Sequence, residues 1–282
     1  MGDRQEIDGG QKALWNGLAG RGWVDMQALT DRMYEPLGDL LVDAVVAVSR
    51  GAVLDVGCGT GRTTVAVARR LGVGSRCTGV DISEPMIAAA RARVERDGTP
   101  AQFIRADAQD YGFEPASVDT VMSRFGVMFF EDPVRAFANL RRAGTSGAAL
   151  RSIVWRGMPE NAFMTTAERA AAPLLPNLLP RRPDGPGQFA FADHRRVCGI
   201  LEESGWNDIE VRPIDVECAF PETDLVAYLT RLGPVGLILQ EADERTRARV
   251  VDAVRPAFEP FVHGADVRFT AACWLVEARG SR

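Results

Sequence analysis

Lysine is almost absent from this 282-residue sequence, in which Lys12 is the single example and arginine supplies the other cationic side chains. The net charge is −5, and no strongly basic segment stands out. A general nucleic-acid contact needs a cationic face that displaces the counterions of the phosphates. The sequence therefore predicts a partner other than nucleic acid.

Cysteine pairs are also lacking, because the cysteines are odd in number, scattered, and contain no CxxC spacing. This pattern indicates buried, reduced thiols and predicts neither a disulfide framework nor a metal site. No uninterrupted apolar run approaches the roughly 20 residues needed to cross a bilayer. The first residues, MGDRQEID, lack the apolar core of a signal peptide. We expect a cytoplasmic protein without a membrane partner.

The hydrophobic content of the chain is high enough to form a substantial core. Hydrophobic residues make up 46% of the chain and charged residues 25%, which predicts one large domain or a domain with an insertion. Short apolar runs alternate with helical patterns between residues 52 and 157. Such alternation is typical of βαβ units and of a parallel sheet with helices on both faces.

The second of these helices has clear ends in the sequence. Ser83 precedes "EPMIAAARARVERDG" and suits the N-cap, and Gly98 suits the terminator. Pro36 suits the first turn of an earlier helix, whose apolar stripe runs to Val48. Right-handed crossovers bring the carboxyl ends of parallel strands to one edge of the sheet, where open α/β sheets bind ligands.

A glycine-rich turn, "VLDVGCGTGRTT" at residues 53–64, follows the first strand. The third glycine of a dinucleotide fingerprint is replaced by Arg62, a large side chain. The turn also lacks the Gly-Lys-Ser/Thr ending of a triphosphate-binding loop. Asp55 precedes the turn and would repel a phosphate but attract an ammonium group. Asp81 ends the next strand, where a carboxylate can hold a ribose.

A ribose beside a cationic amino-acid group describes S-adenosylmethionine. The combination of "VLDVGCGTG", "GVDIS" and "RADAQD" resembles the class I S-adenosylmethionine-dependent methyltransferases, and the wider pattern resembles the bacterial small-molecule group near the ubiquinone and menaquinone-biosynthesis enzymes. The resemblance implies an α/β, Rossmann-like fold with a mostly parallel seven-stranded sheet. It also implies helices on both faces, an antiparallel last strand and a helical cap.

The resemblance also implies a cofactor site, residue by residue. The turn that holds Gly57, Cys58, Gly59 and Gly61 would pass under the methionine part, with Asp55 near its ammonium group. Asp81 would hold the ribose. The remaining expected contacts are Ile82 and Met86 against the adenine, Asp107 and Ala108 at its amino group, and Ser123 and Arg124 beside the methionine part, largely through backbone atoms.

The same reading divides the chain into four parts. We expect an N-terminal helical lid over residues 1–48, which includes Trp15 and Trp23, and a cofactor-binding core over 49–157. Residues 158–265 would form a substrate cap interleaved with a late core strand, and 266–282 the last strand of the sheet. A homodimer is left open.

The segment "SRFGVMFFEDP" after the fourth strand bears on the methyl acceptor. It lacks the Asp-Pro-Pro-aromatic motif of DNA amino-methyltransferases, the paired glutamates of protein arginine methyltransferases and the acids of magnesium-dependent catechol-type enzymes. The sequence therefore predicts a small-molecule acceptor. His194 is the weak candidate for a catalytic base, and no other residue is assigned that role.

Two alternatives are carried forward. A catalytically silent regulator or subunit could bind the cofactor on the same fold. A nicotinamide-dependent oxidoreductase is disfavoured by Arg62 in the glycine turn.

Overall fold

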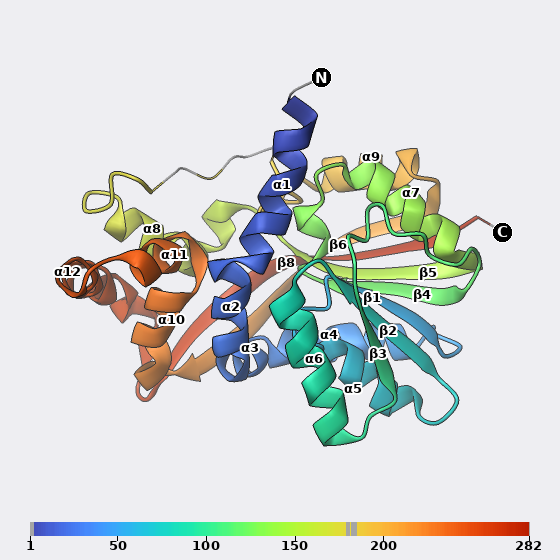
Figure 1. The fold of residues 1–282 in the computed structure, drawn as a ribbon, viewed down its shortest axis with the longest axis horizontal. Coiled ribbons are helices and arrows are strands. Elements are labelled where there is room, and N and C mark those ends of the chain that lie inside the picture. The colour runs from blue at the N-terminus through green and yellow to red at the C-terminus, as the bar shows by residue number, and fades with distance from the viewer. Residues whose placement is uncertain (1–2, 179–180, 182–184, 282) are drawn as a thin grey trace.

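The computed structural model describes residues 3–178, 181 and 185–281. Its centre is an eight-stranded sheet in the order β3-β2-β1-β4-β5-β8-β6, with β7 paired to β8 (Figure 1). The strands are β1 (Ala52–Val56), β2 (Arg76–Asp81), β3 (Ala101–Arg105), β4 (Val118–Arg124), β5 (Gly144–Trp155), β6 (Trp206–Pro221), β7 (Val262–His263) and β8 (Asp266–Gly280).

The strand directions follow the expected pattern. Strands β1 to β5 pair in parallel, and β8 is antiparallel to both β5 and β6. The mostly parallel, Rossmann-like sheet with an antiparallel last strand is thus confirmed. The predicted count of seven strands is extended by β7, which has only two residues and whose pattern is too short to recognise in the sequence.

Helices cover both faces of the sheet. Helices α4, α5 and α6 pack on one face, and α7 and α9 on the other (Figure 1). The α-helices are α1 (Asp3–Asn16), α2 (Leu18–Asp25), α3 (Gln27–Met33), α4 (Glu35–Val46), α5 (Arg62–Leu71), α6 (Glu84–Asp97), α7 (Pro133–Ala143), α8 (Ala162–Ala171), α9 (His194–Glu203), α10 (Leu225–Arg231), α11 (Gly233–Glu241) and α12 (Glu244–Val254).

The predicted helix ends have their expected chemistry. The hydroxyl of Ser83 accepts a hydrogen bond from the backbone N–H of Met86, and α6 ends at Gly98 in the left-handed conformation, with φ of +62°. Pro36 occupies the first turn of α4. These local signals alone therefore locate both helices.

The N-terminal part is helical throughout its described length. Helices α1 to α4 follow one another closely, and Gly17 and Met26 separate the first three. Figure 1 shows α1 and α2 standing in front of the sheet, above the carboxyl ends of its strands. Residues 3–46 thus lie in α1 to α4 or in the short turns between them. The role of this segment as a lid remains a proposal.

Strands β6 and β8 are longer than the rest and carry the cap. β6 pairs with β8 from Trp206–Gly280 to Pro221–Asp266, whereas β5 pairs only with residues 273–279 of β8. Helices α8, α10, α11 and α12, which we call the cap, lie beside the part of this ribbon that extends beyond β5 (Figure 1). Phe163 of α8 stacks on Phe269 of β8, and Tyr228 of α10 lies against Phe220 of β6. Among the described helices, none combines the length and the apolar character needed to cross a membrane.

Candidate functional site

One cavity of about 690 Å³ lies between the sheet, the N-terminal helices and the cap. The strand ends of the sheet, helices α1 to α3 and the cap all contribute to its lining. Nine of the twelve predicted contacts line this cavity, and Asp55, Gly61 and Ser123 do not. The nine are Gly57, Cys58, Gly59, Asp81, Ile82, Met86, Asp107, Ala108 and Arg124. Residues from four separate strand ends thus converge on one hollow.

The glycine turn has a conformation that side chains would disturb. Gly57, Gly59 and Gly61 have φ of +66°, +55° and +82°. A Cβ on Gly57 would lie 2.5 Å from the Cα of Gly126, in the loop after β4. Two backbone segments therefore touch here, which only glycine permits. The result is a bare backbone wall along one side of the cavity.

Asp55 lies beneath this wall and does not line the cavity itself. It is fully buried, and its Oδ2 accepts hydrogen bonds from the hydroxyls of Thr63 (2.8 Å) and Thr64 (2.6 Å). Its Oδ1 has no partner in the described part of the chain. Burial raises the pKa of this carboxyl to about 6, although both threonine hydroxyls and Arg124 lower it. A buried oxygen without a partner favours a cationic ligand group nearby.

Asp81 faces the cavity with both oxygens anchored. Oδ2 accepts the N–H of Gly59 and Oδ1 accepts the N–H of Ser83, each at 2.9 Å. Burial nevertheless raises the pKa of Asp81 from its ordinary value. Each carboxylate oxygen has a second lone pair, so the pair can accept from two ligand hydroxyls.

The N-terminal helices are fastened to the residues that follow Asp81. Asn16 donates to the carbonyl of Ile82 (3.1 Å) and accepts from the N–H of Glu84 (2.9 Å). The Ser83 hydroxyl donates to the carbonyl of Trp15 at 2.6 Å. The end of α1 is thus tied directly to the tip of β2.

The expected adenine side has a further member that the sequence did not reveal. Met86 and Ala108 are buried, and Asp107 accepts the N–H of Gln109 at 2.9 Å. Gln109 also lines the cavity, and its side-chain oxygen accepts the N–H of Asp132 at 2.8 Å. Only the folding of the loop after β3 brings this amide to the site.

Ser123 and Arg124 have different roles. The hydroxyl of Ser123 donates to the carbonyl of Val56 (2.8 Å) and accepts from Gly126 (3.2 Å), so it joins two loops and does not line the cavity. The guanidinium of Arg124 enters the cavity, donates to the carbonyl of Tyr34 at 3.1 Å and lies 5.9 Å from that ring. The resemblance implies contacts largely through backbone atoms at both positions, whereas the structure brings the side chain of Arg124 to the cavity.

Phe125 has a strained backbone that sequence analysis did not detect. Its φ is +66°, the left-handed region that bulky residues rarely adopt. Its ring stacks on Trp155 at 4.6 Å, with only 10° between the planes. Strain of this kind costs about 1–3 kcal/mol and persists where the surroundings enforce it. The backbone here turns an aromatic ring toward the cavity.

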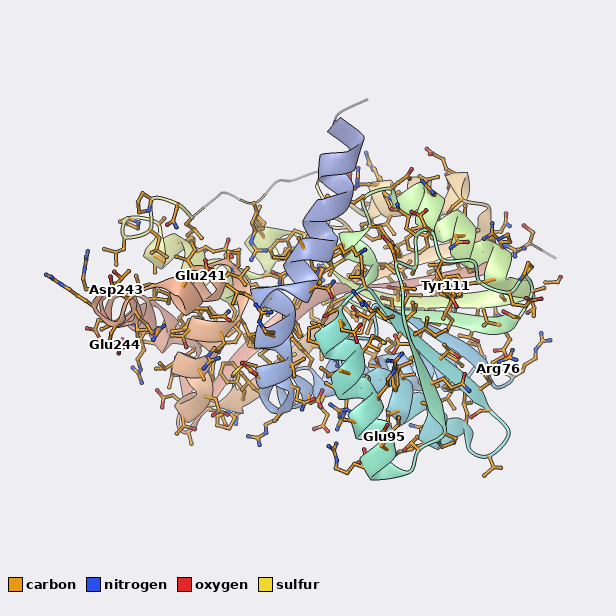
Figure 2. All side chains as sticks on the ribbon, in the orientation of Figure 1. Arg76, Glu95, Tyr111, Glu241, Asp243 and Glu244 are labelled. Carbon is orange, nitrogen blue, oxygen red and sulfur yellow. The ribbon has the colours of Figure 1, made fainter. Side chains whose placement is uncertain are left out.

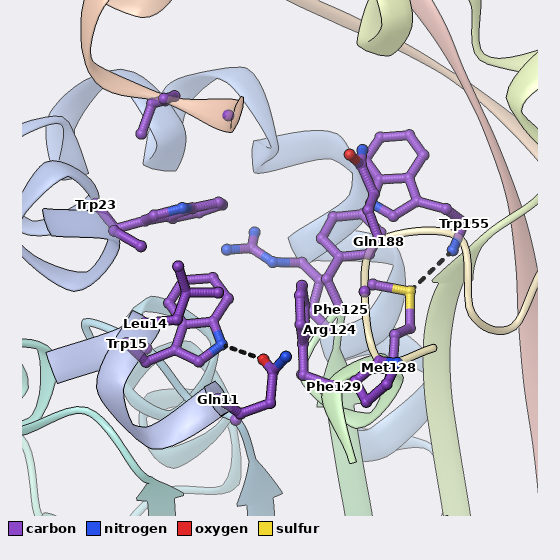
Figure 3. A pocket seen from close by; sticks show the side chains of 18 of the residues that line it. Gln11, Leu14, Trp15, Trp23, Arg124, Phe125, Met128, Phe129, Trp155 and Gln188 are labelled. Carbon is purple, nitrogen blue, oxygen red and sulfur yellow. Dashed lines mark hydrogen bonds between the residues drawn. The ribbon is translucent and has the colours of Figure 1, made fainter. Parts of the chain in front are cut away.

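Figure 3 shows the aromatic side chains of the N-terminal helices facing those of the core across the cavity. Trp15 meets the edge of Phe129 at 5.0 Å, and its indole N–H donates to Gln11 at 3.2 Å. Arg124 points between Trp15 and Trp23 (Figure 3). Both tryptophans line the cavity, and their role in a lid stays a prediction.

His194 is not part of this assembly. It begins α9, is exposed, and its ring lies 5.6 Å from that of Trp274. It is absent from the lining of the cavity, so we assign it no role in catalysis. Among the described residues, no cluster of histidine, cysteine and acidic side chains could hold a metal ion.

Comparison with known proteins gives a consistent picture. Residues 53–147 match a family described as a methyltransferase domain. A nocamycin O-methyltransferase from Saccharothrix syringae is 31% identical over 204 residues, which cover 65% of this chain and 71% of that protein. A solved structure titled for the conversion of a disulfide bond into a thioacetal group during echinomycin biosynthesis is 25% identical. It aligns with a TM-score of 0.55 over 87% of this chain and 81% of that one.

Uncharacterized mycobacterial proteins are also similar. One from Mycobacterium tuberculosis is 28% identical over 181 residues, covering 63% of this chain. The chain spans 61% of the length of that relative.

Proposed function

The chain belongs to the S-adenosylmethionine-dependent methyltransferases, and we propose that it transfers a methyl group to an oxygen, nitrogen or carbon atom of a small-molecule metabolite. The main support is the single cavity that joins the glycine turn to an aromatic chamber roofed by the cap. The cofactor of the family is S-adenosylmethionine, and the residues present fit it. The bare backbone of Gly57, the paired oxygens of Asp81 and the buried charge of Asp55 suit its methionine, ribose and ammonium parts.

Within this proposal each residue has a defined task. Asp81 accepts from the ribose hydroxyls, and Asp107 and Gln109 lie on the adenine side. The Arg124 guanidinium, which no carboxylate pairs in the described part of the chain, faces the carboxylate of the methionine part. Asp55 stabilises the ammonium group from below the turn.

The chain's contribution to the reaction is alignment and exclusion of water. The bound cofactor supplies an electrophilic methyl carbon. The aromatic side chains and the cap hold the acceptor in line with it, and such alignment can lower a barrier by about 7–11 kcal/mol. No residue in the cavity is assigned as a base. A phenol or alcohol acceptor benefits from one, whereas a neutral amine can react without it.

The names of two relatives, the nocamycin O-methyltransferase and an aklanonic acid methyltransferase, support an acceptor from secondary metabolism, with oxygen as the first atom to test. A quinone-like acceptor remains a prediction from the sequence. The net charge of −5 supports a partner other than nucleic acid. Location in the cytoplasm and a homodimer remain predictions from the sequence. Because the chain belongs to the methyltransferases, we no longer consider the alternative of a nicotinamide-dependent oxidoreductase.

The proposal is tested by mass spectrometry. The protein is incubated with S-adenosylmethionine and a panel of phenols, carboxylic acids and amines, and we expect a product heavier by one methyl group. Binding of S-adenosylhomocysteine without any product across the panel would favour the second candidate, a silent cofactor-binding regulator or subunit. Absence of cofactor binding would contradict both.

The Asp81→Ala variant tests the ribose contact. We expect its affinity for S-adenosylhomocysteine, measured by isothermal titration calorimetry, to weaken by about 1.5–3 kcal/mol, because hydrogen bonds to a charged group are lost. Asp43→Ala is the control, since Asp43 forms an exposed ion pair with Arg70 on the outer face. Unchanged affinity in Asp81→Ala would mean that the ribose lies elsewhere.

A further inference from the structure

The half of the cavity away from the glycine turn has aromatic walls, and we call it the acceptor chamber. It is lined by Trp23, Tyr34, Phe125, Trp155, Met164 and Tyr228. Tyr34 stacks on Trp23 at 6.5 Å and meets the rings of Phe125 at 5.4 Å and Trp155 at 6.1 Å. Such walls favour a flat ring system over a flexible polar chain.

The charged groups of the cap at this cavity already have partners. Arg181 donates to both oxygens of Glu168 and to the side chain of Gln188. Arg231 pairs with Asp25 at 3.0 Å. A ligand would have to displace these contacts in order to bind there, so they are poor candidates for recognising it.

Two tyrosine hydroxyls differ from these groups. Tyr34 is only 5% exposed, and its hydroxyl forms no hydrogen bond with any described residue. The hydroxyl of Tyr228 has only the sulfur of Met164 at 3.9 Å, a weak acceptor. Because both side chains line the cavity, both hydroxyls are available to a partner that is not part of the chain.

The two phenols come from different parts of the protein, and both line the same cavity. Tyr34 joins α3 to α4, and Tyr228 lies in α10 of the cap. Burial raises the pKa of Tyr34 well above its ordinary value, and the nearby phenol of Tyr228 raises it further. Burial likewise raises the pKa of Tyr228. Both hydroxyls therefore stay protonated at neutral pH and can donate.

We propose that Tyr34 and Tyr228 form the polar subsite of the acceptor chamber and hydrogen-bond a carbonyl or phenolic oxygen on a flat, aromatic-ring acceptor. The ring lies against the walls formed by Trp23, Phe125 and Trp155. This subsite rests on the proposed function, because it gives the methyl acceptor a chemical class. It makes Tyr34 and Tyr228 positioning residues that select oxygenated rings.

The test uses 1-naphthol and naphthalene, which share the ring system and differ in one hydroxyl. Their affinities are measured by equilibrium dialysis on protein saturated with S-adenosylhomocysteine, so that the cofactor half is filled. The wild type is expected to prefer 1-naphthol. Tyr34→Phe and Tyr228→Phe should each reduce this preference by between about twofold and about tenfold, the range for one hydrogen bond. In the double variant the preference should disappear.

The ratio of the two affinities in each variant distinguishes loss of a hydrogen bond to the hydroxyl from general disruption of the acceptor chamber. A general loosening of the chamber lowers both affinities and leaves their ratio unchanged. Tyr111→Phe is the control: this third tyrosine is exposed and lies outside the cavity, at the surface of the core (Figure 2). Its ratio should equal that of the wild type.

Three results would overturn the proposal. They are no binding of 1-naphthol to the wild type, equal affinity of the wild type for both probes, and a double variant that keeps the wild-type preference. If the double variant keeps the preference, an ordered water or another side chain binds the hydroxyl of 1-naphthol. Failure of the proposed function is seen separately, as absence of S-adenosylhomocysteine binding in the first step.

Discussion

Gly57→Ala is expected to lower the affinity for S-adenosylhomocysteine at least tenfold and to destabilise the protein by about 2–4 kcal/mol. The added Cβ would lie 2.5 Å from the Cα of Gly126, so that one of two backbone segments has to move. The φ of +66° adds about 1 kcal/mol of strain. Gly57 and Gly126 both line the cavity, so a backbone shift that destabilises the protein also changes the shape of the binding site. Calorimetry and thermal unfolding measure them.

Gly98→Ala is the matched control. Gly98 has nearly the same φ, +62°, but a Cβ there would meet nothing within 4 Å. This variant should lose only about 1 kcal/mol of stability and bind the ligand normally. Equal behaviour of the two variants would show that the close contact between Gly57 and Gly126 has no role in binding.

Asp55→Asn is expected to abolish a pH dependence of both stability and binding. The folded pKa of about 6 lies above the ordinary 3.8, so the folded protein binds this proton more tightly than the unfolded chain. The stability that this proton confers is therefore present at low pH and is lost as pH rises from about 4 to about 6. The upper limit for a shift of about two pH units is about 3 kcal/mol.

Denaturant unfolding from pH 4.5 to 7.5 measures this difference. The stability of the variant relative to the wild type should rise with pH across this range. Asp119→Asn is the control. Burial raises the pKa of Asp119, but its hydrogen bonds, from Ala52 and Thr120 among others, together hold it below the ordinary value. Its relative stability should thus stay constant over the same range.

Ligand binding should respond in the opposite direction. The carboxylate form of Asp55 stabilises the ammonium group of S-adenosylhomocysteine, so the affinity of the wild type should fall as pH drops below about 6. Asp55→Asn should bind at least tenfold more weakly at pH 7 and show no such fall. A wild-type affinity that is constant between pH 5 and 7.5 would contradict the role given to Asp55.

The sequence was most informative where the signal is local. The cap of Ser83, the terminator Gly98 and the glycine turn each depend on a few neighbouring residues, and the structure has them as expected. The convergence of Asp81 and Asp107 on one cavity followed from the topology of parallel strands, which the alternation of patterns predicts.

Contacts between distant segments could not be predicted in the same way. Gln109, Phe125 and the pair Tyr34 and Tyr228 reach the cavity through the fold of loops and the packing of the cap, for which the sequence has no short signature. That Asp55 lies beneath the turn could not be predicted either, because it depends on the hydroxyls of Thr63 and Thr64 in the first turn of α5, which donate to its carboxylate.

The continuous ladder between β6 and β8 limits how an acceptor can enter. From Val211–Val276 to Pro221–Asp266 the strands pair without interruption. Helices of the cap pack on these two strands through Phe163 against Phe269 and Tyr228 against Phe220. A movement of the cap together with these two strands would break backbone hydrogen bonds of the sheet. The end of α1 is held to the tip of β2 by a few hydrogen bonds of Asn16 and Ser83, which can open without breaking the sheet. We therefore expect an acceptor to enter on the side of α1.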